Sequence, residues 1–220
     1  VTTDAGLMQD RARYLREANW HAAARQLLAR PHSFTQRPVD VEKWYELLLI
    51  VAREAAADGQ QTLAYNIGRQ VDDALPAGAD VSLQSLGVRD EYTSLTWMAG
   101  QIAMRSLNRP NEALTLFDKY SRGGRSLQVL SKGAYWAGRA ATQSGRFADA
   151  TQQFGRAAAY PELFYGQLAL ERLARPIPAP SGAPQLLVTE PQRIAFANRG
   201  LVRAIRTLGQ QGRRDEQALF

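Results

Sequence analysis

The chain has 220 residues, of which 45% are apolar and 22% charged, with 27 basic and 21 acidic side chains and no cysteine. The missing cysteine excludes disulfides and thiolate metal sites, and no apolar run approaches the ~18 residues that a membrane span needs. The net charge of +6 would attract polyanions such as nucleic acid, anionic lipid or an acidic wall polymer, or would serve solubility alone.

One short pattern occurs four times and predicts helical hairpins. Each copy has a turn residue that tolerates left-handed backbone: Asn19, Gly59, Asn108 and Gly145. An alanine follows at the fifth position, and a groove-filling residue one turn later: Ala24, Ala64, Ala113 and Ala150, then Leu28, Gly68, Phe117 and Phe154. A small residue precedes each turn by two helical turns: Ala12, Ala52, Gly138 and, displaced by one position, Gly100. The pattern predicts an all-α chain, specifically an α-solenoid or superhelix of TPR-like hairpins.

The first hairpin is predicted over residues 4–29, followed by a loop over 31–38. Its expected apolar stripe at helical spacing is Leu7, Ala12, Tyr14 and Leu15. The second hairpin opens at Asp40, a good N-cap residue. Its first helix presents Trp44, Leu47, Leu48 and Val51. We expect its return helix over 62–75 and a surface loop over 76–89.

The third hairpin restarts at Asp90 and carries apolar residues at helical spacing: Tyr92, Leu95, Trp97, Met98 and Ile102. Pro110 suits the first turn of its return helix, whose inward residues are Ala113, Leu116 and Phe117. Residues 122–125 are predicted to form a plain turn between repeats, with an anion-binding nest as the alternative. The fourth hairpin is predicted over 135–157.

A further helix is predicted from Pro161 to Leu173, and four prolines then indicate an extended linker. Thr189 and Gln192 form a capping box for a helix that ends near Gly209, and a short helix follows. The predicted domains are therefore a helical-repeat region (1–175), a Pro-rich linker (176–188) and a further helical segment (189–220). Since a hairpin cut short would leave an apolar face uncovered, we expect this to be a piece of a longer protein.

The sequence offers little for catalysis or metal binding. The two histidines, His21 and His32, have no third ligand type near them, and no nucleophile elbow, phosphate-binding loop or dinucleotide fingerprint is present. The neighbouring acids 72–73 and 90–91 point in different directions on a helix and form no catalytic dyad. We therefore expect no catalytic, cofactor-binding or metal-binding residue.

Four aromatic residues allow two interpretations. They could stack on sugars or fill the core, and the core is favoured; they are Trp44, Trp97, Tyr135 and Trp136.

Residues 135–178 resemble the soluble lytic murein transglycosylases, at the end of the superhelical, U-shaped region of that family. The specific part is Phe164–Ala169 followed by Glu171–Leu173, which generic helical repeats have no reason to carry. Residues 92–97 and 7–24 also resemble the family, so the resemblance covers most of 4–178. Its signature residues, to which we assign a structural role, are Trp136, Gly138, Phe164, Tyr165, Gly166, Glu171 and Arg172.

The resemblance implies a periplasmic enzyme that cleaves the MurNAc–GlcNAc bond of peptidoglycan without water and leaves 1,6-anhydro ends. In that family a separate lysozyme-like domain holds one essential glutamate as general acid and base. No Glu-Ser pair with the expected Gly-rich continuation occurs here, and a short match to the catalytic domain at Ala5–Gln9 stops at Asp10. These 220 residues are therefore predicted to be inactive, with the catalytic domain and peptidoglycan strands as partners, the strands held weakly by charge.

Two other functions remain as alternatives. A TPR-like scaffold could bind a protein in its groove, although that leaves the string at 164–173 unexplained. A nucleic-acid binder is supported by charge alone and lacks a recognisable reading motif, so no nucleic-acid partner is expected.

Overall fold

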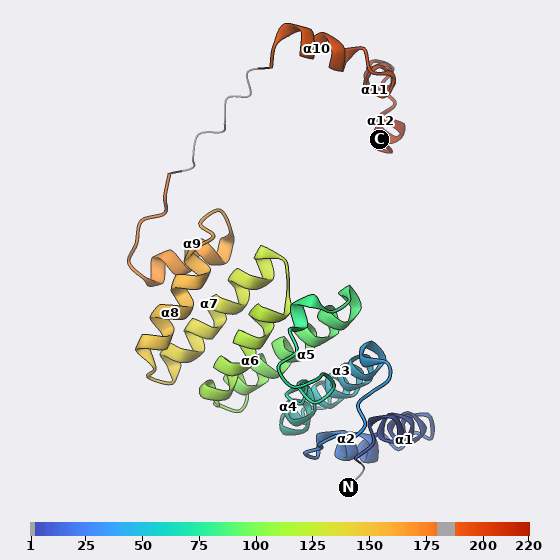
Figure 1. Cartoon of the computed structure of the whole chain (residues 1–220), viewed down its shortest axis with the longest axis vertical. Helices are drawn as coiled ribbons and strands as arrows, with labels where there is room; N and C mark the ends of the chain where they lie inside the picture. Colours follow the sequence, from blue (N-terminus) through green and yellow to red (C-terminus); the bar gives the residue numbers. More distant parts are fainter. Residues whose placement is uncertain (1–2, 180–187) are drawn as a thin grey trace. The chain divides into compact units, whose positions relative to one another are not determined.

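The computed structural model describes residues 3–179 and 188–220 and confirms the prediction of an all-α chain (Figure 1). Within these ranges there is no strand, only an isolated bridge between Asp4 and Gln36. The chain divides into two compact units, Val1–Pro178 and Ala179–Phe220. Most of the linker predicted over 176–188 lies outside the described residues.

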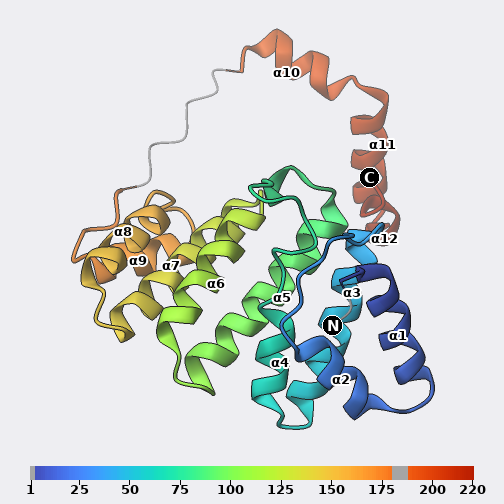
Figure 2. The ribbon, with the colours of Figure 1, turned by 60° about the horizontal axis from the view of Figure 1, so that its bottom comes forward.

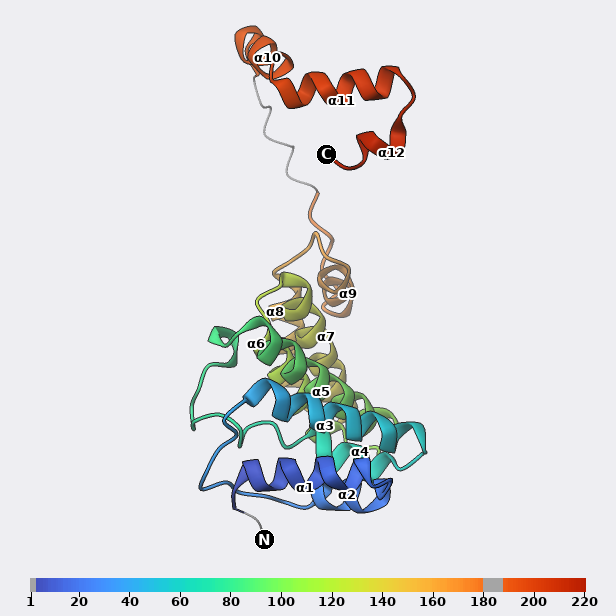
Figure 3. The same ribbon diagram turned by 90° about the vertical axis from the view of Figure 1, so that its right-hand side faces the viewer.

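The first unit is a series of helices in which each α-helix has its substantial contacts with the one or two α-helices that precede or follow it. The helices are α1 (Ala5–Glu17), α2 (His21–Ala29), α3 (Val41–Ala57), α4 (Gln61–Gly68), the 3-10 helix η1 (Val81–Leu83), α5 (Leu86–Arg105), α6 (Pro110–Gly123), α7 (Leu127–Gln143), α8 (Phe147–Ala158) and α9 (Phe164–Arg172). Figure 2 shows α5 to α8 side by side in chain order, and Figure 3 shows α1 and α2 beside α3 and α4.

The four predicted turns close the four hairpins α1–α2, α3–α4, α5–α6 and α7–α8. Their turn residues all have a left-handed backbone: Asn19 (φ 60°), Gly59 (φ 75°), Asn108 (φ 51°) and Gly145 (φ 74°). At Gly59 the N–H donates to the carbonyl of Ala56 at 3.1 Å, and the next N–H, of Gln60, donates to Ala55 at 2.8 Å. This pair of bonds satisfies the free carbonyls at the end of α3 and sends the chain back along it.

The third turn is one residue longer than the others. In each hairpin the residue after the turn residue donates its backbone N–H to a carbonyl of the first helix. This carbonyl lies five residues earlier in the chain for Trp20, Gln60 and Arg146. For Arg109 it lies six residues earlier, at Ala103, with a distance of 2.7 Å. The extra residue explains why Gly100 lies one position further from its turn than its counterparts do.

In two hairpins the small residue before the turn is a glycine, and a phenylalanine ring of the returning helix packs directly against it. A Cβ atom added to Gly100 would lie 2.7 Å from the ring of Phe117, and one added to Gly138 would lie 2.7 Å from the ring of Phe154. Both rings are buried. The predicted pattern therefore reflects helix packing. Because glycine has no side chain, the two helices can approach closely with an aromatic ring between them.

The apolar core of the first unit is elongated and has no single centre. One cluster runs from Met8 to Leu95 and a second from Ala55 to Ala169, and the partly buried Leu63 and Met98 pack against both. The inward residues predicted for the second and third hairpins are buried, except that Trp97 and Met98 are only partly covered.

The predicted stripe of the first hairpin is half wrong. Ala12 and Leu15 are buried, but Leu7 and Tyr14 are each 62% exposed. The buried face of α1 instead contains Ala5, Met8, Gln9, Ala12 and Leu15. The spacing of three and four residues from Met8 is the correct period.

Three predicted boundaries of the first unit are also wrong. The return helix of the second hairpin ends at Gly68 and not at residue 75, because the chain turns inward and buries Val71. The loop expected over 76–89 contains η1 and the start of α5, which Ser85 caps by accepting from the Val88 N–H. The turn expected over 122–125 begins later, since α6 runs through Gly123.

The helix expected from Pro161 begins only at Phe164. The residues between them form a turn in which the Leu163 N–H donates to the Tyr160 carbonyl at 3.0 Å. That carbonyl lies against Gly166, where an added Cβ would be only 1.8 Å away. Gly166 therefore lets α9 pass directly over the end of the preceding segment.

The second unit contains α10 (Glu190–Ala197), α11 (Gly200–Gln210) and α12 (Arg214–Gln217). The Thr189 N–H donates to Gln192 at 3.0 Å, as the predicted capping box requires. The single helix expected up to Gly209 is broken, because Arg199 has extended backbone (ψ 133°). Gly212 (φ 71°) repeats the left-handed turn of the first unit between α11 and α12.

Two glycine-to-alanine changes should have opposite effects on stability. Gly138→Ala forces a methyl group into the ring of Phe154 and should lower the free energy of unfolding by about 1–3 kcal/mol. Gly155→Ala lies within α8, where an added Cβ meets nothing within 4 Å, and should raise it by about 0.5–1 kcal/mol through helix propensity. Urea denaturation measures both, and equal effects of the two changes would contradict this packing.

Tyr65 links the second hairpin to the third. Its hydroxyl donates to the Glu112 carboxylate of α6 at 2.5 Å. Burial, and then this hydrogen bond, raise the pKa of Tyr65 to about 12. The neutral phenol is therefore the form that the folded state stabilises.

The contribution of Tyr65 should disappear at alkaline pH. Because its folded pKa exceeds the unfolded value of about 10, the contribution is complete below about pH 10 and is lost as the pH rises towards 12. The difference in unfolding free energy between the wild type and Tyr65→Phe should shrink over that window. Chemical denaturation at a series of pH values checks this, and a constant difference would refute it.

Candidate functional site

Most cationic side chains on the second helix of each hairpin (α2, α4, α6 and α8) and at the ends of these helices are paired with acids. The pairs include Arg25–Asp58 (2.6 Å), Arg122–Asp118 (2.9 Å), Arg146–Asp149 (2.6 Å), Arg109–Glu112 (3.6 Å), Lys119–Asp72 and Arg156–Asp118. By contrast, Arg105 of α5 and Lys132 and Arg139 of α7 form no ion pair within the described part of the chain.

These three free cations gather on two tryptophans. The rings of Trp97 and Trp136 meet edge to face, with centroids 5.7 Å apart. The Lys132 ammonium lies 3.6 Å from the centroid of Trp97. The guanidinium carbons of Arg105 and Arg139 lie 5.1 and 4.6 Å from the centroid of Trp136. We call these five residues the aromatic–cationic cluster.

The parts of α5 and α7 that carry this cluster contain no acid. Residues 92–105 of α5 and the whole of α7 contain no Asp or Glu. The local potential is therefore positive, and cation–π contacts hold the charged groups without neutralising them. A guanidinium stacked on a ring keeps its N–H donors free for a carboxylate.

The core fixes the position of the cluster. Trp136 is 9% exposed and its ring contacts that of Phe117, with centroids 5.8 Å apart. Its indole N–H is buried without a hydrogen-bond partner. Burial lowers the pKa of Lys132. The rings thus form a rigid platform, and the long cationic side chains are its adjustable part.

A shallow groove of about 440 Å³ leads to the exposed part of Trp97. Arg53 and Ala56 of α3 line one side, and Ser94 and Gln101 of α5 line the other. The side-chain nitrogen of Gln101 is buried and has no partner. The groove and the cluster together offer an aromatic surface and free cations.

The signature residues lie mainly in the packing of α7 and α9. Trp136 and Gly138 are buried in α7, and Gly166 lets α9 approach the preceding turn. Tyr165 packs on Tyr135 with ring centroids 5.5 Å apart. The others are exposed: Phe164, Glu171 and Arg172.

Sequence reasoning found the aromatic residues but missed their cations. Trp44, Tyr135 and Trp136 are core residues, as favoured, and Trp97 is partly buried and packs against the core. Lys132 was not singled out, although the acid-free stretches around it are visible in the sequence. Such a stretch on two neighbouring helices is the signal that could have identified the cluster.

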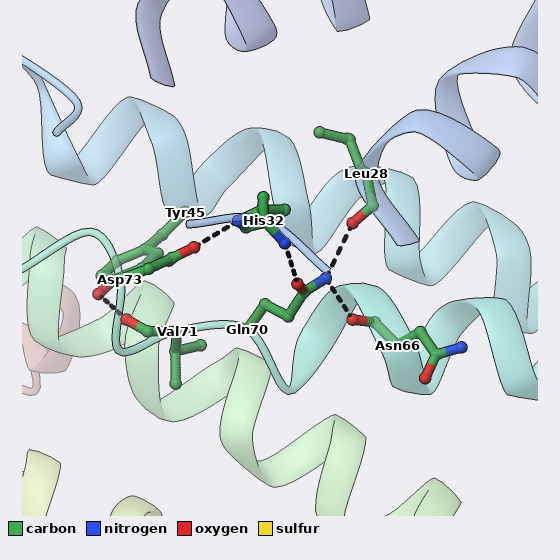
Figure 4. A network of polar contacts seen from close by, with 7 residues as sticks. All are labelled: Leu28, His32, Tyr45, Asn66, Gln70, Val71 and Asp73. Carbon is green, nitrogen blue, oxygen red and sulfur yellow. Dashed lines mark hydrogen bonds and ion pairs between the residues drawn. The ribbon is translucent and has the colours of Figure 1, made fainter. Parts of the chain in front are cut away.

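A second polar site surrounds His32 and is shown in Figure 4. The His32 Nδ1 atom is paired with the Asp73 carboxylate. The backbone N–H of His32 donates to Gln70 Oε1 at 3.2 Å, and Gln70 Nε2 donates to the carbonyls of Leu28 (3.1 Å) and Asn66 (2.8 Å). This network joins the exit of α2 to the end of α4.

The His32 site is structural and not catalytic. The His32 side chain is only 1% exposed, and its ring is stacked on Phe34 with centroids 4.7 Å apart. No substrate could reach it. The neighbouring Asp72 points elsewhere and pairs with Lys119, so the two acids do not act together.

Comparisons with family models, curated proteins and solved structures found no match to this chain. Among the described residues, no three His, Cys, Asp or Glu side chains are placed to hold a metal ion. The described helices also include none with the length and apolar character of a membrane span.

The Gln70 hydrogen bonds should contribute measurably to stability. Gln70→Ala would leave the His32 N–H and the Leu28 carbonyl without their partner, and should lower the free energy of unfolding by about 1–3 kcal/mol. Gln26→Ala, at an exposed position of α2, is the matched control and should change it by less than about 0.5 kcal/mol. Urea denaturation compares the two, and equal values would contradict the network.

Proposed function

We propose that this chain is the non-catalytic, superhelical scaffold of a periplasmic lytic transglycosylase that acts on peptidoglycan. The observation that carries the proposal is the string Phe164–Leu173, which resembles that family and forms α9 and its C-cap. The tight approach of Gly166 to Tyr160 supports it, because it gives this string a specific structural role that a generic repeat does not require.

An α-solenoid of TPR-like hairpins is the architecture within this proposal. The contacts between near neighbours along the chain and the shared turn geometry at Asn19, Gly59 and Gly145 support it. An elongated core with two overlapping clusters is what stacked repeats produce, since each repeat covers the face of the next.

The aromatic–cationic cluster gives the scaffold its contact with the wall. Peptidoglycan carries carboxylates on its stem peptides, and the free cations Arg105, Lys132 and Arg139 offer donors that no internal acid occupies. Attraction of this kind is weak, long-ranged and sensitive to salt. The bond cleavage itself is assigned to a separate lysozyme-like domain.

A TPR-like scaffold that binds a protein is the second candidate. The groove between α3 and α5 supports it, because its apolar lining of Trp97, Met98 and Ile102 is suited to the side chains of an extended peptide segment. A discrete protein bound in this groove, together with no attachment to the wall, would favour this candidate over the first.

Binding to purified sacculi tests the first candidate. We expect the wild type to co-sediment with sacculi at about 10 mM salt and to be released towards 150 mM, as the Debye length falls from about 30 to about 8 Å. The double variant Arg105→Gln with Lys132→Gln should bind roughly 3- to 10-fold more weakly. Arg11→Gln with Arg13→Gln, an equal charge loss on exposed residues of α1, is the control and should bind nearly as the wild type does.

Two results would overturn this proposal. One is the absence of binding at low salt, and the other is equal weakening by the two double variants, which would indicate net charge alone. The chain by itself should release no anhydro-muropeptides from sacculi, and their appearance would contradict the assignment of the chemistry to another domain.

A further inference from the structure

A second cavity, of about 460 Å³, lies where α7, α8 and α9 meet. Its apolar walls come from Met104 of α5, Phe154 of α8 and Leu173 after α9. The volume falls in the lower part of the range of ~300–1,000 Å³ that is typical of ligand sites. An apolar group of modest size could be buried there.

Two arginines, Arg139 and Arg172, line this cavity. Arg139 is held on the Trp136 ring, and Arg172 belongs to the last turn of α9. Neither forms an ion pair among the described residues, and no acidic side chain lines the cavity. Two arginines on the lining of a cavity without acids are suited to an anion, and the planar guanidinium is suited to a carboxylate.

The remaining polar groups of the cavity offer hydrogen-bond acceptors, and Gln143 keeps one amide N–H as a donor. The hydroxyl groups of Thr142 and Thr151 already donate to the carbonyls of Gly138 and Phe147, both at 3.0 Å. Gln143 uses its amide nitrogen to donate to Asn108 at 3.2 Å. Their oxygen lone pairs are left for a ligand, and an amide N–H is the donor that fits them.

We propose that this cavity binds the C-terminal carboxylate of a short peptide with small apolar side chains. The carboxylate meets Arg139 and Arg172, the apolar side chains lie against Met104 and Phe154, and the amide N–H groups donate to the threonine oxygens. Phe147, which is 68% exposed at the cavity, covers the bound chain. The stem peptide of the wall is the source of such a ligand, and in that respect the inference rests on the proposed function.

The test uses N-acetyl-trialanine and its C-terminal amide as probes of the whole chain. Calorimetry at low salt should show saturable binding of the acid and about tenfold weaker binding of the amide. Arg172→Gln, at an exposed position, should weaken binding of the acid about tenfold and leave binding of the amide unchanged. Arg175→Gln, an exposed residue outside the cavity, is the matched control and should bind both probes as the wild type does.

The site of binding is checked by NMR, in which the backbone amide signals of Thr142 and Thr151 should shift with the acid. Equal affinity for acid and amide, no effect of Arg172→Gln, or shifts confined to other helices would overturn the proposal. Failure of peptide binding with sacculus binding retained would reject this cavity alone. Peptide binding in the absence of sacculus binding would support the cavity and reject the wall as its source.

Discussion

The close approach of paired helices across a missing side chain is the contact on which the first unit depends. At Gly100 and Gly138 a phenylalanine ring occupies the place where a Cβ would be, so each helix can return directly along its partner. The left-handed turn residues make the reversal in the fewest residues. In the third and fourth hairpins these two features together place the rings of Phe117 and Phe154 in the core.

The same packing positions the unpaired cationic side chains of α5 and α7. Phe117, set against Gly100, contacts Trp136 and Trp97, and these tryptophans carry the free cations of the surface. Several acids of the unit are paired with cations of a neighbouring hairpin, such as Glu54 with Arg16 at 2.7 Å. Positive charge therefore remains where α5 and α7 run without acidic residues, and this arrangement underlies both proposed binding sites.

The turns and the inward alanines were predictable from the sequence because each depends on a local rule, left-handed backbone or helical spacing. The same rules gave wrong predictions where several residues fit the helical spacing equally well. Leu7 and Tyr14 fit a helical stripe as well as Met8 does, and only tertiary packing decides among them. Pro161 permits a helix start, but the contact of Gly166 with Tyr160 delays it to Phe164. The cavity between α7, α8 and α9 joins residues that no spacing rule connects.

The additional residue in the turn at Asn108 has a consequence for how arrays of this type change over time. The hydrogen bond from Arg109 to Ala103 absorbs a one-residue insertion within the bend, while the ring of Phe117 still reaches Gly100. Length changes can thus accumulate at the bends without disturbing the helix faces. Successive hairpins can therefore differ in the period of their sequence pattern while their helices keep the same contacts.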